Sequence, residues 1–165
     1  MGRYNVKEIA NFILDYADSR SIKLSNMSLN KLAYFAYEYM LFSKGISLTG
    51  AKIEAWDHGP VFREIYSSFK NFGSEPITTR ASSYNSRTNS VNIVIPSIES
   101  DDERAIIESI ESLIDLPAYV LREISHHSDG PWAKVWHHTT SSNPGMQITD
   151  EIILQSSPTV SLRHG

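Results

Sequence analysis

The chain has 165 residues, of which 41% are hydrophobic and 21% charged, and its net charge is −4 at pH 7. This composition is typical of one soluble globular domain, and it excludes a disordered or fibrous protein. The absence of cysteine excludes disulfides, thiolate catalysis and cysteine-held metals, and there is no run of about 18 apolar residues that would span a membrane.

The same composition bears on location and partners. A chain without cysteine fits a reducing compartment, so we expect a cytoplasmic protein. Proteins that bind phosphate backbones usually carry basic clusters, and none is visible in this chain of pI near 5.8. The acidic balance therefore slightly favours a basic protein partner over nucleic acid.

Two helices are predicted in the first third of the chain. Apolar residues recur at helical spacing over Val6–Asp18, and Ser28 stands where the N-cap of a second helix is expected. Within Leu29–Phe42 the polar residues are few, namely Asn30, Lys31 and Glu38. A helix that is apolar nearly all round is normally buried, so this segment is the predicted centre of the core, and Gly45 is its predicted end.

A short strand and a third helix are predicted next. The alternation over 52–56 suits an edge strand. Pro60 has no N–H to lose and a φ that suits a helix, so we expect it at the first helical position, with Asp57 or His58 capping free N–H groups. Gly73 is the predicted end of that helix.

The segment from residue 74 to 96 is rich in Ser, Thr and Asn and predicts a two-stranded ribbon. Val91, Ile93 and Ile95 alternate, which places them on one face of a strand. The polar tip of the ribbon is expected near residues 85–89.

The rest of the chain predicts four short helices. A capping box at Ser100–Glu103 opens the first of them. Pro117, Pro131 and Thr149 mark the starts of the others. The predicted fold is therefore mainly α (α+β): a compact single-domain helical bundle around a central apolar helix, with a small antiparallel β-hairpin. One domain is expected over residues 1–160, followed by a frayed tail at 161–165.

Candidate catalytic and metal-binding residues are weak. Asp57 and His58 would form an acid–base pair, but the sequence shows no third group to orient the histidine. The candidate histidines are His58, His126, His127, His137 and His138, and they lack the HExxH spacing of a zinc site. Phosphate-binding and nucleophile motifs are absent as well. We predict a protein that is no enzyme, with no catalytic residues, no metal and no cofactor.

Four segments in order resemble a known family. They are "LNKLAYFAYEYML", "IEAWDHGPV", "YSSFKNFGSEPI" and "ISHHSDGPWAKVW", and together they resemble the SocA-like/GepA antitoxin family, also called the Panacea domain. The residues that carry the resemblance are Leu29, Lys31, Leu32, Tyr34, Trp56, His58, Gly59, Pro60, Val61, Gly73, His126, Pro131 and Trp132. Asn30 departs from the family pattern, which often has glutamine there, and His127 is an alternative to His126.

The resemblance implies an antitoxin that binds and neutralises a protein toxin encoded by an adjacent gene. Some members of the family look like adapters that deliver the toxin to a cytosolic protease, and an association with prophages is also expected. The motif residues are predicted to be structural or partner-binding, with toxin specificity in variable surface segments, first of all near residues 85–89. A DNA-binding transcriptional regulator and a small metal-dependent hydrolase are the alternatives, and the oligomeric state is left open.

Overall fold

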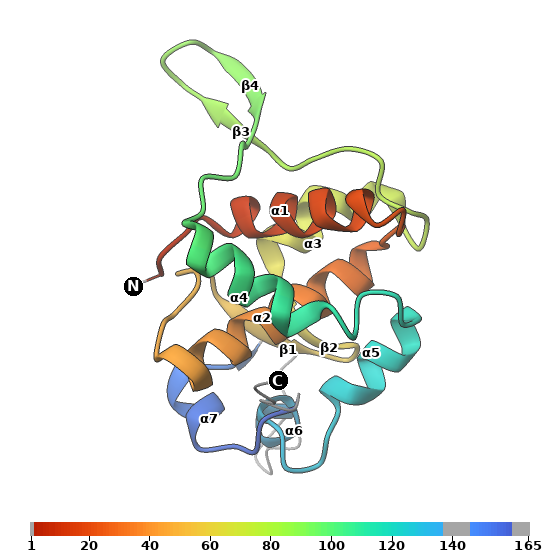
Figure 1. Cartoon of the computed structure of the whole chain (residues 1–165), viewed down its shortest axis with the longest axis vertical. Coiled ribbons are helices and arrows are strands. Elements are labelled where there is room, and N and C mark those ends of the chain that lie inside the picture. The colour runs from red at the N-terminus through yellow and green to blue at the C-terminus, as the bar shows by residue number, and fades with distance from the viewer. Residues whose placement is uncertain (1, 137–145, 160–165) are drawn as a thin grey trace.

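The computed structural model describes residues 2–136 and 146–159. Figure 1 shows a body of helices around one central helix, with a small sheet behind it and a β-hairpin that projects from one end. The helices are α1 (Val6–Ser19), α2 (Asn26–Lys44), α3 (Arg63–Phe69), the 3-10 helix η1 (Lys70–Phe72), α4 (Ser100–Ile110), α5 (Ala118–Ser125), α6 (Pro131–Trp136) and α7 (Asp150–Leu154). The strands are β1 (Ile53–Trp56), β2 (Gly59–Phe62), β3 (Ser82–Asn85), β4 (Ser90–Ile93) and β5 (Met146–Gln147). The predicted α+β class is confirmed.

Helix α2 is the centre of the core, as its sequence predicted. It contacts α1, α3, α4, α5, α7 and β2, and its residues from Leu29 to Leu41 are all buried. The predicted N-cap was wrong by three residues: Ser25 caps the helix, and its side chain accepts a hydrogen bond from the N–H of Ser28. Gly45 ends the helix in the left-handed conformation at φ 66°, which a glycine adopts without steric cost.

The Gly59-Pro60 segment is a hairpin and not a helix start, so that prediction was wrong. The three-stranded antiparallel sheet has the order β2-β1-β5, which also makes β1 a central strand and not an edge strand. Pro60 pairs with Ala55 on β2, and α3 begins only at Arg63. The φ of proline suits an extended strand as well as a helix, and an edge strand such as β2 tolerates the missing N–H.

The ribbon of β3 and β4 is confirmed. It pairs Ser82 with Ile93 and Asn85 with Ser90, and it stands clear of the helices in Figure 1. Its base is fixed to α1, because the Asn11 side chain donates to the carbonyls of Ala81 and Val94 and accepts from the N–H of Ala81. The predicted tip forms the connecting turn of the ribbon.

The later helices begin close to where they were predicted. Pro131 is the first residue of α6, Pro117 precedes α5, and the Thr149 side chain caps α7. The capping box at Ser100–Glu103 was wrong, since α4 starts at Ser100 without a side-chain cap. Strand β5 was not predicted, and the tail at 161–165 lies outside the described residues. Among the described helices, none combines the length and hydrophobicity that crossing a bilayer requires.

Candidate functional site

The polar residues at the start of α2 bind the free edge of β2. Lys31 Nζ donates to the Pro60 carbonyl at 2.7 Å, and the Asn30 side-chain oxygen accepts from the N–H of Phe62 at 3.0 Å. Asn30 also donates to the backbone and side-chain oxygens of Asn26. The buried helix thus supplies hydrogen-bond partners that a fourth strand would otherwise supply, and this explains polar residues in an apolar helix.

Lys31 is the most unusual side chain of this region. Its exposed fraction is 1%, and burial, reinforced by the charge of Arg122, lowers the pKa of its ammonium to about 7. Since an unfolded lysine titrates near 10.4, the unfolded chain binds more protons than the folded chain at mildly alkaline pH.

This difference predicts a stability that rises with pH. Between pH 7.5 and 9 we expect the free energy of unfolding to increase by roughly 1 kcal/mol per pH unit, because Lys31 is then neutral only in the folded state. Burial lowers the pKa of His126 too, but that group titrates below this window. Urea unfolding at several pH values should show the slope, and Lys31→Met should abolish it. The same slope in both proteins would contradict a deprotonated Lys31.

Gly59 allows the hairpin to approach Lys31 and α5 closely. Its φ is +107°, and a Cβ there would lie 2.4 Å from Ser125 Oγ and 2.9 Å from Lys31 Cε. Both the backbone conformation and the available space therefore require glycine. The Gly59-Pro60 pair of the motif thus joins β2 to α2 and α5.

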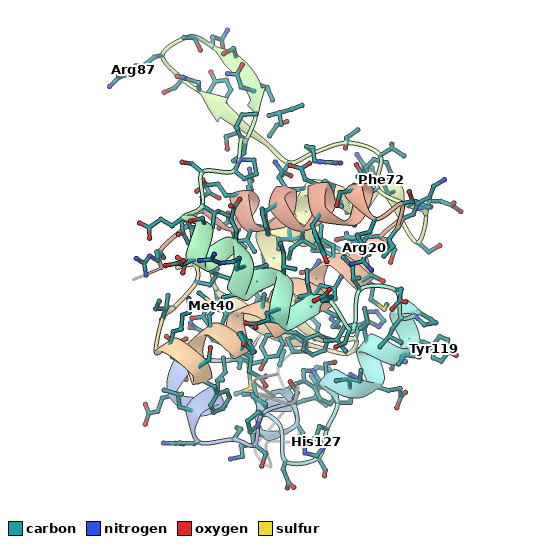
Figure 2. The ribbon with its side chains drawn as sticks, in the orientation of Figure 1. Arg20, Met40, Phe72, Arg87, Tyr119 and His127 are labelled. Atoms are coloured by element: carbon teal, nitrogen blue, oxygen red, sulfur yellow. The ribbon has the colours of Figure 1, made fainter. Side chains whose placement is uncertain are left out.

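A stack of aromatic rings lies beside the hairpin. The His126 and Trp132 rings are parallel at 3.8 Å, and the Trp132 and Trp136 rings stack at 5.6 Å. Trp132 is buried and donates from Nε1 to the Trp56 carbonyl at 2.7 Å. His127 is exposed and points away from the body in Figure 2, whereas His126 stacks on Trp132.

Two residues that the sequence analysis missed complete the hairpin. Glu54 is 3% exposed, accepts from Trp56 Nε1 at 3.0 Å and receives two hydrogen bonds of 2.8 Å from Arg63. These bonds from Arg63 hold the pKa of the Glu54 carboxyl below its usual range. The alternation of the strand gave no signal for this burial, because it places Glu54 on the opposite face from the core residues Ile53 and Ala55.

A cavity of about 360 Å³ lies between the start of α2, the hairpin and α3. Five motif residues line it, namely Lys31, Trp56, His58, Val61 and Gly73. The other lining residues are Ser25, Asn26, Met27, Asn30, Tyr66, Lys70, Ser74 and Ala118. The remaining motif residues lie elsewhere: Leu29, Leu32 and Tyr34 are in the core, each with an exposed fraction of 0%. Gly59 and Pro60 are on β2, Pro131 starts α6, and His126 and Trp132 form the stack.

The residues considered for catalysis are not brought together. Asp57 and His58 form the exposed two-residue turn between β1 and β2, and neither side chain makes a hydrogen bond to a described residue. Within residues 2–136 and 146–159, no group of three His, Asp or Glu side chains is placed to hold a metal ion. His137 and His138 lie outside the described residues. The motif residues outside the core thus join the β1–β2 hairpin to the surrounding helices, and they lie beside a cavity.

Comparison with known proteins identifies the family. The model of the family described as "Antitoxin SocA-like, Panacea domain" matches residues 29–133, which is well over half of the chain. A relative described as "Antitoxin SocA", from Caulobacter vibrioides (strain NA1000 / CB15N), is 32% identical over 150 residues, which cover 90% of this chain and 80% of the relative. No solved structure matches the chain. The chain belongs to the SocA-like antitoxin family with a Panacea domain, as the resemblance predicted.

Proposed function

We propose that this protein is a cytoplasmic antitoxin that neutralises a protein toxin by binding it directly. The observation that carries the proposal is the likeness to an antitoxin over 90% of the chain. A family of antitoxins implies a toxin as partner and a non-enzymatic role. The adjacent gene as the source of the toxin is part of the proposal, as is an association with prophages.

The ribbon of β3 and β4 is the surface that we propose for the toxin. Tyr84, Val91 and Ile93 are between 55% and 68% exposed. Tyr84 lies opposite Val91, and Ile93 lies two residues further along the same face. A row of apolar side chains that faces solvent on a projecting element is typical of a protein contact.

The backbone and charge of the ribbon also favour a protein as the partner. Each strand pairs only with the other among the described residues, so both edges are open to a further strand. Two strands alone are marginally stable in water, and a third strand would add main-chain hydrogen bonds. The ribbon bears no carboxylate, and its one charged residue is Arg87 at the tip, which points outward in Figure 2. Apolar contact and strand pairing should therefore dominate.

Co-expression with the neighbouring open reading frames tests the proposal. Each neighbour is expressed from one foreign promoter and this chain from another. We expect one neighbour to stop growth alone and this chain to restore it. A transcriptional regulator would give no protection here, because it does not control the foreign promoter that expresses the toxin. If this chain fails to protect against a toxic neighbour, direct neutralisation is contradicted.

A host strain lacking its ATP-dependent proteases separates the two modes of neutralisation. Protection that persists in this strain supports stoichiometric binding. Protection that disappears there supports the subsidiary hypothesis, in which this chain delivers the toxin to a protease.

A further inference from the structure

We propose that the cavity beside Lys31 binds a carboxylate carried on an aromatic or aliphatic group. The site is separate from the projecting ribbon, and the inference does not depend on the toxin partner. Four features of the cavity lead to this ligand class: its apolar walls, its charge, the free donors of Lys31 and the start of α2.

The walls of the cavity are apolar and aromatic. The Trp56 and Tyr66 rings meet edge to face with centroids 4.9 Å apart, and Met27 and Val61 add aliphatic surface. A volume of about 360 Å³ falls within the range of small-ligand sites, which are mostly apolar with a few placed polar groups. The walls thus fit one ring or a short aliphatic chain.

The charge of the cavity is opposite to that of the chain. Lys31, His58 and Lys70 line it, and no lining residue is Asp or Glu, although the net charge of the chain is −4. Lys70 and His58 are exposed and border the opening, whereas Lys31 is buried at the inner wall. An anionic group is therefore favoured at the inner wall over a neutral or cationic group.

Lys31 has hydrogen-bonding capacity to spare. An ammonium has three donors, and the Pro60 carbonyl is the one hydrogen-bond acceptor that Lys31 finds among the described residues. Arg122 lies near enough for its charge to act on Lys31, and its own buried Nε lacks a partner within the described part of the chain. A buried cation without a carboxylate costs free energy, which a bound carboxylate would recover.

The start of α2 adds a second anion-binding element. Ser25, Asn26 and Met27 line the cavity and form the N-cap and first two positions of a 19-residue helix. The first N–H groups of a helix have no partner within the helix, and its N-terminus favours negative charge. One buried ammonium and one helix start suit a single carboxylate, held while its apolar body packs on Trp56.

A titration followed by nuclear magnetic resonance at pH 6, below the Lys31 pKa of about 7 so that its ammonium is present, tests this site. The probe is 3-phenylpropionate, and the control ligand is 3-phenylpropionamide, which has the same shape without charge. We expect saturable shifts of the Trp56 indole N–H, with a Kd on the order of 1 mM for the acid and binding at least ten times weaker for the amide. Equal binding of acid and amide, or shifts that leave Trp56 unchanged, would overturn the proposal.

Three variants test which lysine binds the carboxylate of the ligand. Lys31→Met should abolish acid binding, and Lys70→Met, which leaves the core intact, should weaken it about threefold. Lys52→Met, an exposed lysine outside the cavity, should bind like the unmodified protein. Unchanged binding in both Lys31→Met and Lys70→Met would refute the site.

A peptide with a free carboxylate distinguishes the sources of the ligand. If N-acetyl-glycyl-phenylalanine binds more tightly than 3-phenylpropionate, a polypeptide end supplies the group. If only the small acid binds, a free metabolite supplies it. If neither compound binds, the cavity is not a carboxylate site.

Discussion

Gly59→Val is expected to lower the free energy of unfolding by about 4 kcal/mol, a size reached only by severe core or backbone defects. The β-branched side chain would be forced into φ +107°, and its Cβ alone would lie 2.4 Å from Ser125 Oγ. The loss combines backbone strain with displacement of Lys31 and α5 from the hairpin. Thermal and urea unfolding measure it.

Gly73→Val is the matched control. Gly73 also has a positive φ, +59°, but no atom lies within 4 Å of a Cβ placed there. The Gly73→Val variant should therefore show the backbone strain without the clash, and its free energy of unfolding should fall by about 1–2 kcal/mol. If Gly59→Val instead keeps full stability while protection against the toxin disappears, the turn is a contact site and its structural role is refuted.

The double variant Val91→Thr with Ile93→Thr is expected to weaken toxin binding by roughly 10- to 100-fold, which corresponds to about 1.4–2.7 kcal/mol. Threonine is β-branched and favours strands like both residues; it matches the shape of valine and is one carbon shorter than isoleucine. Because Val91 and Ile93 are 68% and 55% exposed, the unfolding free energy should change by less than about 0.5 kcal/mol. Calorimetric titration with the purified toxin measures the affinity.

Leu154→Gln provides the control for this variant. Leu154 is 52% exposed on α7, outside the ribbon, so its replacement should leave toxin affinity unchanged. Equal affinity of the ribbon variant and the unmodified protein would move the toxin contact elsewhere. Because apolar contact dominates in this account, affinity should also depend little on salt.

Helix positions were predictable where the cause was local. The apolar run of α2, the left-handed end at Gly45 and the proline start of α6 all follow from the residues themselves. The ribbon was predictable as well, because alternation and turn residues lie within a short segment. These features depend on periodicity and on backbone preference.

The Gly59-Pro60 segment was mispredicted because its conformation depends on distant residues. The φ of Pro60 suits both a helix start and a strand. The strand forms because Pro60 pairs with β1 and its carbonyl accepts a hydrogen bond from Lys31 on α2. The role of Lys31 was hidden for the same reason: the sequence places this lysine in a helix expected to be buried, but does not show which carbonyl it contacts. Strand β5, with two residues, has no period to detect. The cavity is made of segments that the sequence keeps far apart.

Hydrogen–deuterium exchange of this chain, alone and with the toxic product of the neighbouring gene, tests the central claim most directly. Direct binding through the ribbon predicts slower exchange of the amides at residues 82–93 in the mixture, because open strand edges become paired or covered. Unchanged exchange along the whole chain, while this chain still protects growth, would contradict neutralisation by binding.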